Sequence, residues 1–284
     1  MHEVRIIARE RRDLLGEGPL WSARDQAVYW TDILSGRLSR VSLADDSVDS
    51  WEIGGYLGWV IERASGGFVA GLDRRIVSLD LDGPRVDTIA DLPGEPGGNR
   101  VNDAKADLLG RIWAGTMPIN CEDPAGAFYR LDTDGSVTCL DKPYTIANGP
   151  AIAADGSFLL HTDTALRTIF RFAINDDASL GPRTPFITFE PGWGNPDGMT
   201  FDADGGLWVA CWGANCVTRF APEGVPERSI RLPASQITSC TFAGPALDRM
   251  FVTSAAVDLE EPLGGALFEV DPGCRGRSTH SYCG

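Results

Sequence analysis

Four short segments of the chain place an oxygen-bearing side chain directly before a run of strand-forming residues. They are Glu17 in GEGPLW, Asn102 in VNDAKA, Asn148 in NGPAIA and Asp197 in PDGMTF. Hard divalent cations prefer carboxylate and amide oxygens as ligands, and two carboxylates held close together without a cation would be costly. If folding brings these segments together, Glu17, Asn148 and Asp197 are candidate ligands of one divalent metal ion.

An ordinary structural role is the alternative for each of these residues taken singly. Asn and Asp before a strand are common turn residues, so one NG or DG dipeptide indicates only a turn. A functional site is favoured because the four residues occur at matching positions of an internal repeat, here called one register. Four DG dipeptides outside that register are predicted to be hairpin turns with no chemistry; they begin at Asp82, Asp134, Asp155 and Asp204.

An internal repeat supplies that register. A turn followed by a short apolar or β-branched run recurs at intervals of 40 to 49 residues, with strands beginning at Val28, Phe68, Ile112, Phe158, Leu207 and Met250. This period is typical of four-stranded propeller blades. Further β-rich runs, such as GRLSRVSL and TIFRFAI, are predicted third strands, and no segment has a sustained helical period. The sequence therefore predicts an all-β, six-bladed β-propeller, a closed ring of four-stranded antiparallel blades forming a single domain over residues 1–284.

The propeller explains why the four polar residues would meet. Each lies 10 or 11 residues before the first strand residue of its repeat, in a predicted turn that leads into an innermost strand. Innermost strands line the central channel, so equivalent positions converge on the axis. The same count in the other two repeats reaches Gly58 and Cys240, which contribute no charge.

The segment EVRIIA at residues 3–8 precedes the first repeat. It alternates apolar Val4 and Ile6 with Glu3 and Arg5, which predicts a strand with one buried face. We expect it to complete the last blade beside ALFEV at residues 266–270.

Composition excludes several classes of partner. The chain carries 40 acidic and 25 basic residues, for a net charge of −15, which argues against nucleic-acid and membrane partners. Seven cysteines without a CxxC pair, in a chain whose start does not resemble a signal peptide, predict reduced thiols and a cytoplasmic location. Oligomeric state is left open between a monomer and a small homo-oligomer.

Several long motifs together resemble one known family. They are GEGPLW at 16–21, NRVNDAKADLLGRIWAGTM at 99–117, NGPAIAADG at 148–156, PDGMTFDADGGLWVACW at 196–212, TSCTFAG at 238–244 and the closing SYCG. In this order they are similar to the SMP-30/gluconolactonase family, which includes regucalcin and bacterial sugar lactonases, and the likeness runs from about residue 12 to the end of the chain.

The resemblance implies a six-bladed propeller that hydrolyses aldono-lactones with one divalent metal. It puts Glu17, Asn148 and Asp197 on the metal-ligand positions, and Arg100 and Asn102 on positions that hydrogen-bond the substrate. The loop after GTM departs from the family, because it reads PINCED where animal members carry other acidic residues that touch substrate. Asn120 or Glu122 is the expected substitute.

The expected reaction is the opening of a small-molecule sugar lactone, of gluconolactone type, to its aldonic acid. A metal such as Ca²⁺, Mn²⁺, Zn²⁺ or Fe²⁺ would polarise the carbonyl, with Asp197 as general base and Asp103 as the alternative base. Two other classes stay open: a calcium-binding regulatory propeller without relevant turnover, and an organophosphate or arylester hydrolase.

Covalent catalysis is disfavoured, because the chain has no GxSxG motif and only three histidines. His161 is predicted to be a packed histidine, with Asp163 beside it able to hydrogen-bond. Trp59 and Trp193 are predicted to lie near the mouth of the channel and to pack between blades.

Overall fold

The structure, a computed structural model, describes residues 3–83 and 85–284. All regular secondary structure in that part of the chain is β-strand. The strands form six four-stranded antiparallel sheets. Five sheets use consecutive strands, and the sixth takes one strand from the beginning of the chain. These are the blades of a six-bladed β-propeller, so the predicted fold class is confirmed.

The described chain divides into two compact units. Unit 1 comprises the chain up to Gly55 together with Phe189–Thr279, and unit 2 comprises Tyr56–Thr188 together with His280–Gly284. Each unit contains three complete blades. The single domain over residues 1–284 therefore stays a prediction.

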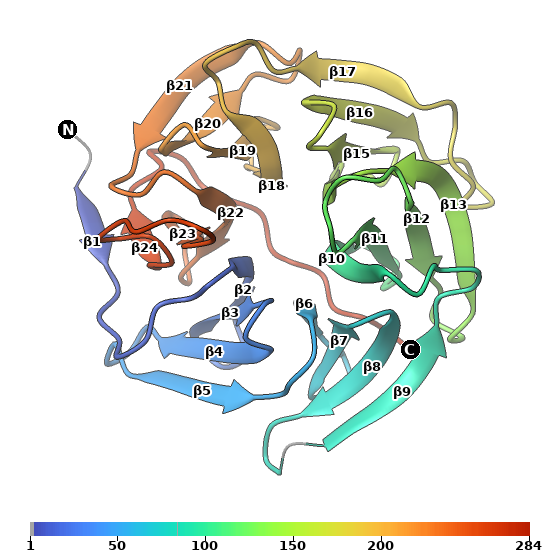
Figure 1. Ribbon diagram of the computed structural model, residues 1–284, viewed down its shortest axis with the longest axis horizontal. Coiled ribbons are helices and arrows are strands. Elements are labelled where there is room, and N and C mark those ends of the chain that lie inside the picture. Colours follow the sequence, from blue (N-terminus) through green and yellow to red (C-terminus); the bar gives the residue numbers. More distant parts are fainter. Residues whose placement is uncertain (1–2, 84) are drawn as a thin grey trace. The chain divides into compact units, whose positions relative to one another are not determined.

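The strands of unit 1 are labelled in Figure 1. They are β2 (Gly16–Ser22), β3 (Ala27–Asp32), β4 (Arg37–Ser42) and β5 (Val48–Glu52) in one blade; β18 (Asn195–Phe201), β19 (Leu207–Trp212), β20 (Cys216–Phe220) and β21 (Pro226–Arg231) in the next; and β22 (Ile237–Ala243), β23 (Arg249–Ser254), β24 (Phe268–Val270) and β1 (Val4–Ile6) in the third.

The strands of unit 2 follow the same plan. They are β6 (Leu57–Glu62), β7 (Phe68–Leu72), β8 (Arg75–Asp80) and β9 (Arg85–Asp91); β10 (Asn99–Ala106), β11 (Ile112–Pro118), β12 (Gly126–Leu131) and β13 (Val137–Tyr144); and β14 (Ala147–Ile152), β15 (Phe158–Asp163), β16 (Thr168–Ala173) and β17 (Thr184–Thr188). The predicted third strands are confirmed as β4, β8, β12, β16, β20 and β24.

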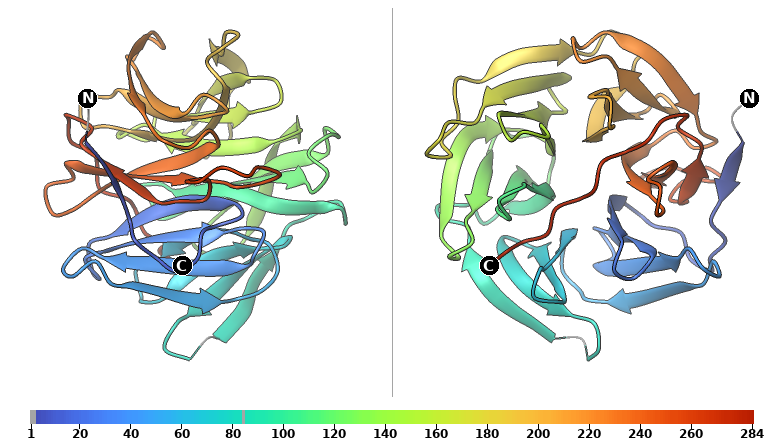
Figure 2. Two further views of the ribbon diagram at one scale, coloured as in Figure 1. Left: turned by 60° about the vertical axis from the view of Figure 1, so that its left-hand side comes forward. Right: turned by 180° about the vertical axis from the view of Figure 1, so that it is seen from behind.

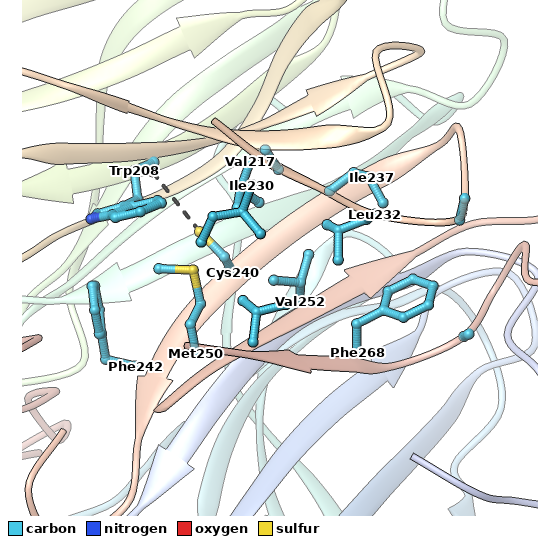
Figure 3. Packing of buried hydrophobic residues seen from close by; sticks show 14 residues of the cluster. Trp208, Val217, Ile230, Leu232, Ile237, Cys240, Phe242, Met250, Val252 and Phe268 are labelled. Atoms are coloured by element: carbon cyan, nitrogen blue, oxygen red, sulfur yellow. Dashed lines mark hydrogen bonds between the residues drawn. The ribbon is translucent and has the colours of Figure 1, made fainter. Parts of the chain in front are cut away.

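Buried apolar side chains join neighbouring blades within each unit. In unit 1, Trp208 of β19, Cys240 of β22, and Met250 and Val252 of β23 belong to one cluster that is almost inaccessible to solvent (Figure 3). In unit 2, Trp113 and Phe128 pack with Leu159 and Phe172 across two blades. This packing fixes the first strands of adjacent blades, and the candidate site residues lie on those strands.

The strand predicted at the start of the chain is confirmed. β1 pairs antiparallel with β24, and the blue N-terminal strand lies beside the red strands of its blade in Figure 2. In this ladder Val4 is opposite Val270, and Ile6 is opposite Phe268. The expected burial of Ile6 is wrong, because its side chain is 44% exposed whereas Ile7 is 4% exposed. β1 is the outer strand of its blade and ends at Ile6; the backbone amide of Ile7 then donates to Leu267.

Deleting residues 1–9 is expected to destabilise the protein on the order of 3 kcal/mol. The deletion removes β1, the buried side chain of Ile7 and the buried ion pair of Arg9 with Asp13 (2.7 Å). We expect the melting temperature to fall by roughly 5–10 °C. The control deletes only residues 1–2, which lie outside the described residues. A nine-residue truncation that melts at the wild-type temperature would show that β1 contributes little to its blade.

Candidate functional site

The residues that share one register lie in the first strands of their blades, at an irregularity in each ladder. In β2, β10, β14 and β18 the pairing with the second strand shifts by one residue, so that the first strand holds one residue more than its partner. Glu17 and Asn148 are the last paired residues before the shift, and Asn102 and Asp197 lie within it.

The predicted turns at these positions are therefore wrong, and the residues occupy β-bulges. A bulge and a turn use the same residue types, because both need glycine or a local break in pairing. Gly149, which follows Asn148, has φ of 78°. A Cβ on Gly198, which follows Asp197, would lie 2.1 Å from the Ser239 hydroxyl. A bulge re-aims the side chain beside it, and so it marks a place where a functional group is directed out of the ladder.

Unit 2 brings Arg100, Asn102 and Asn148 into one buried hydrogen-bonded array. The Arg100 Nη1 atom donates to Asn102 Oδ1 (2.6 Å) and to the carbonyl of Val101 (3.0 Å). Asn102 Nδ2 donates to Asn148 Oδ1 (2.9 Å) and to the carbonyl of Ala147 (2.7 Å). The three side chains are at most 5% exposed. Two predicted substrate-binding residues and one predicted metal ligand are thus in direct contact.

Asp103, the alternative base, has a different environment. Its carboxylate accepts hydrogen bonds from the backbone amides of Ala104 (2.7 Å) and Gly149 (3.1 Å), and Lys105 Nζ lies 3.6 Å away. Burial raises the pKa of the Asp103 carboxyl, and the charge of Lys105 opposes that rise. The side chain therefore ties β10 to the bulge of β14, and we do not propose it as the base.

Unit 1 holds the two carboxylates of the predicted metal set. Glu17 in β2 and Asp197 in β18 are 4% and 5% exposed. Glu17 Oε2 accepts a hydrogen bond from the backbone amide of Gly18 (3.0 Å). Two buried carboxylates beside bulges of first strands offer the oxygen ligands that a hard divalent cation prefers.

The loop between β11 and β12 carries the two residues expected to replace the acidic substrate contacts. Asn120 and Glu122 are exposed. Asn120 Nδ2 donates to Asp123 (2.8 Å), and its Oδ1 accepts from the backbone amide of Glu122 (3.1 Å). Both of these hydrogen bonds lie within the loop itself. A substrate contact by Asn120 or Glu122 stays a prediction.

His161 is a packed histidine, as predicted. It lies in β15, with its ring centroid 3.9 Å from that of Phe128 and 4.8 Å from that of Tyr144. Burial lowers the pKa of His161 to about 3, so the ring is neutral near pH 7. Its neighbour Asp163 accepts hydrogen bonds from the backbone amides of Thr145 and Ala165. Both residues therefore have structural roles.

The two tryptophans expected near the mouth are packing residues. Trp59 is 1% exposed and belongs to the apolar cluster around Val101. Trp193 packs against Phe189 and Phe220, with ring centroids 5.7 Å and 6.0 Å away.

One contact of the array was missed by sequence reasoning. Asn148 Nδ2 donates to Thr164 Oγ1 (2.9 Å), and Thr164 lies just after β15, a strand later in the chain. Nothing in the segment LLHTDT distinguishes this threonine from Thr162, because the contact depends on how β14 and β15 pair.

The protein is a six-bladed β-propeller with buried polar side chains at the bulges of its first strands. The sequence pattern of the SMP-30/Gluconolactonase/LRE-like region matches residues 15–256, and the chain belongs to this family. The resemblance seen in the sequence is confirmed.

Particular relatives are similar over almost the whole chain. Pentonolactonase XacC of Haloferax volcanii is 34% identical, over 93% of this chain and 92% of its own length. A 6-deoxy-6-sulfogluconolactonase of Pseudomonas putida is 32% identical, over 96% of this chain and 98% of its own. A solved structure described as a calcium-binding protein, regucalcin, from Agrobacterium tumefaciens has a TM-score of 0.92 at 27% identity, over 99% of this chain and 97% of its own.

These findings confirm the expected enzyme class, since the lactonases among the relatives are carboxylic ester hydrolases. Within residues 3–83 and 85–284, no group of three or more His, Cys, Asp or Glu side chains could hold a metal. The predicted ligand set has only two carboxylates and takes an amide oxygen as its third ligand. No helix in the described part of the chain is long and apolar enough to cross a bilayer.

Proposed function

We propose that the protein is a metal-dependent hydrolase that opens a sugar aldono-lactone, of gluconolactone type, to the aldonic acid. One observation carries the proposal: four buried polar side chains lie in, or directly before, the bulge of four different first strands. They are Glu17, Asn102, Asn148 and Asp197. Membership of a family whose relatives include lactonases supports the substrate class. Comparing the hydrolysis of aldonolactones with that of phenyl acetate and paraoxon tests it.

Glu17, Asn148 and Asp197 are the proposed ligands of one divalent ion. Two carboxylates and one amide oxygen suit a hard or borderline cation that keeps open positions for water and substrate. Ca²⁺, Mn²⁺, Zn²⁺ and Fe²⁺ are all compatible with this set, and the calcium-binding description of the regucalcin relative favours Ca²⁺ among them. When bound, the cation would polarise the lactone carbonyl and stabilise the charge that develops on its oxygen.

The protein's own residues would perform the remaining steps. Asp197 accepts a proton from water as the water oxygen bonds to the carbonyl carbon. The ring C–O bond then breaks, and the proton is delivered to the ring oxygen. Arg100 supplies directed donors for the hydroxyl and carbonyl oxygens of the lactone. Both hydrogens of the Asn102 amide are donated within the array, so its Oδ1 atom accepts a hydrogen bond from a lactone hydroxyl.

A calcium-binding regulatory role is the second candidate, because the regucalcin relative carries that description. Arg100 and Asn102, which suit a polyol better than a metal alone, favour the lactonase. An organophosphate or arylester hydrolase would need an apolar mouth. The net charge of −15 supports a small-molecule substrate over a nucleic-acid or membrane partner, and a cytoplasmic monomer or small homo-oligomer is part of the proposal.

Arg100→Ala is expected to lower kcat/KM for the best sugar lactone by more than about tenfold, mainly through KM. The reason is the loss of directed hydrogen bonds to the substrate oxygens. Steady-state kinetics at saturating metal would measure this separately from any change in metal affinity. Arg100→Lys, which keeps the charge but not the planar fork, should recover only part of the loss. Unchanged kcat/KM in Arg100→Ala would refute the substrate role.

A further inference from the structure

The hydrogen bonds among Arg100, Asn102 and Asn148 in unit 2 determine which way each side-chain amide is oriented. A guanidinium has donors and no acceptor, so the atom of Asn102 that faces Arg100 must be its Oδ1. The amide nitrogen of Asn102 then faces Asn148, and it also meets the backbone carbonyl of Ala147, which can only accept. The contacts with Arg100 and with Ala147 therefore require the same orientation of the Asn102 amide.

The orientation of the Asn102 amide determines that of the Asn148 amide. Because Asn102 donates toward Asn148, the atom of Asn148 that faces it must be its Oδ1. The amide nitrogen of Asn148 is directed to the opposite side, where Thr164 Oγ1 accepts its hydrogen bond at 2.9 Å. The oxygen retains a second lone pair for a cation, whereas a reversed amide would present a nitrogen that cannot coordinate one.

Thr164 is well placed to hold this end of the array. Thr164 is only 8% exposed. Its backbone amide donates to the carbonyl of Ile146 (2.9 Å), the residue just before β14. The backbone amide of Arg167 donates to the Thr164 carbonyl (3.0 Å) and closes the turn that follows β15. These two bonds fix the backbone of Thr164 relative to β14, and from there its Oγ1 atom lies 2.9 Å from Asn148 Nδ2.

We infer that Thr164 is a positioning residue that holds the Asn148 amide with its oxygen available for the metal. This inference rests on the proposed function, in which Asn148 is a metal ligand. A residue that hydrogen-bonds to a metal-ligating side chain and orients it commonly contributes tenfold or more to metal affinity. Thr164 thereby becomes part of the metal site without touching the metal or the substrate.

The test compares Mn²⁺ affinity of the full-length wild type, Thr164→Val and Thr164→Ser by titration calorimetry. Valine has nearly the shape of threonine but cannot accept the hydrogen bond, so we expect Mn²⁺ to bind about tenfold more weakly. Serine keeps the hydroxyl and should restore most of the affinity. At saturating Mn²⁺, KM for a sugar lactone should be close to the wild-type value in both variants.

Thr162→Val is the matched control. Thr162 lies in β15 directly opposite Asn148, is fully buried, and its hydroxyl makes no hydrogen bond to other residues that the structure describes. Loss of that hydroxyl should leave Mn²⁺ affinity unchanged. If Thr164→Val and Thr162→Val both bind Mn²⁺ as the wild type does, the positioning role is wrong while the proposed function stands.

A second readout does not depend on metal. Hydrogen exchange of the Asn148 side-chain amide, followed by NMR in the metal-free protein, should be slow in the wild type and Thr164→Ser and at least about tenfold faster in Thr164→Val. A wild type that binds no divalent ion would overturn the proposed function. Equal exchange rates in the wild type and Thr164→Val would overturn the orientation of Asn148 by Thr164.

Discussion

Asp197→Ala is expected to lower kcat/KM for sugar lactones by at least roughly a thousandfold and to abolish tight binding of the divalent ion. The variant loses one of two carboxylates proposed to bind the metal, and it also loses the group proposed to accept a proton from water. General-base catalysis alone contributes about 10²–10⁴-fold. Lactone hydrolysis in a pH-stat, together with metal analysis of the purified variant, measures both losses.

Asp197→Asn separates the two roles of this residue. An amide oxygen can still coordinate a cation but is a poor base, so metal retained with a large fall in kcat supports the base assignment. If the rate is retained as well, another group is the base. Asp204→Asn is the control, because Asp204 is exposed in the turn between β18 and β19 and should be silent. An Asp197→Ala variant as active as wild type would remove Asp197 from the site.

Removal of the metal is the second large expected effect. A chelator should abolish lactone hydrolysis by more than about a hundredfold, since the protein would lose its means of stabilising the charged oxygen of the reacting carbonyl. Adding back Ca²⁺, Mn²⁺, Zn²⁺ or Fe²⁺ should restore activity, and the ion that restores most identifies the preferred metal. Circular dichroism before and after chelation is the control for unfolding.

Metal-free protein with full activity, verified by elemental analysis, would contradict the metal mechanism. It would leave Arg100 as the group that polarises the carbonyl. Retained Ca²⁺ binding with no hydrolysis of any lactone would instead favour the regulatory role.

The blade architecture could be predicted from the sequence because its cause is local. Each blade needs short runs of β-branched and aromatic residues between turn residues, and these runs recur with the spacing of a propeller. The pairing of β1 with β24 was also predictable, since EVRIIA lies outside the six repeats. The exposure of Ile6 was not, because an alternating pattern does not show that a strand ends early at the outer edge of a sheet.

The candidate site was predictable in its residue types and only partly in its geometry. Counting within the repeat puts Asn102 and Asn148 at one position, whereas the ladders place Asn148 one residue earlier relative to the bulge; a hydrogen bond nevertheless joins the two side chains. Their location in bulges was missed, because Gly149 serves a bulge as well as it serves a turn. The backbone contacts of Asp103 and the side-chain contact of Thr164 arise from pairing between distant strands, which no local pattern encodes.

The most direct test of the central claim is the initial rate of hydrolysis by the metal-loaded protein on a panel of aldonolactones, measured beside phenyl acetate and paraoxon. The account predicts that at least one aldonolactone is hydrolysed with kcat/KM of about 10⁴ M⁻¹s⁻¹ or more, the lower end of the usual range for enzymes on their own substrates. Phenyl acetate and paraoxon should be slower by at least about a hundredfold. Rates on every aldonolactone that equal the uncatalysed rate, or a clear preference for paraoxon or phenyl acetate, would contradict it.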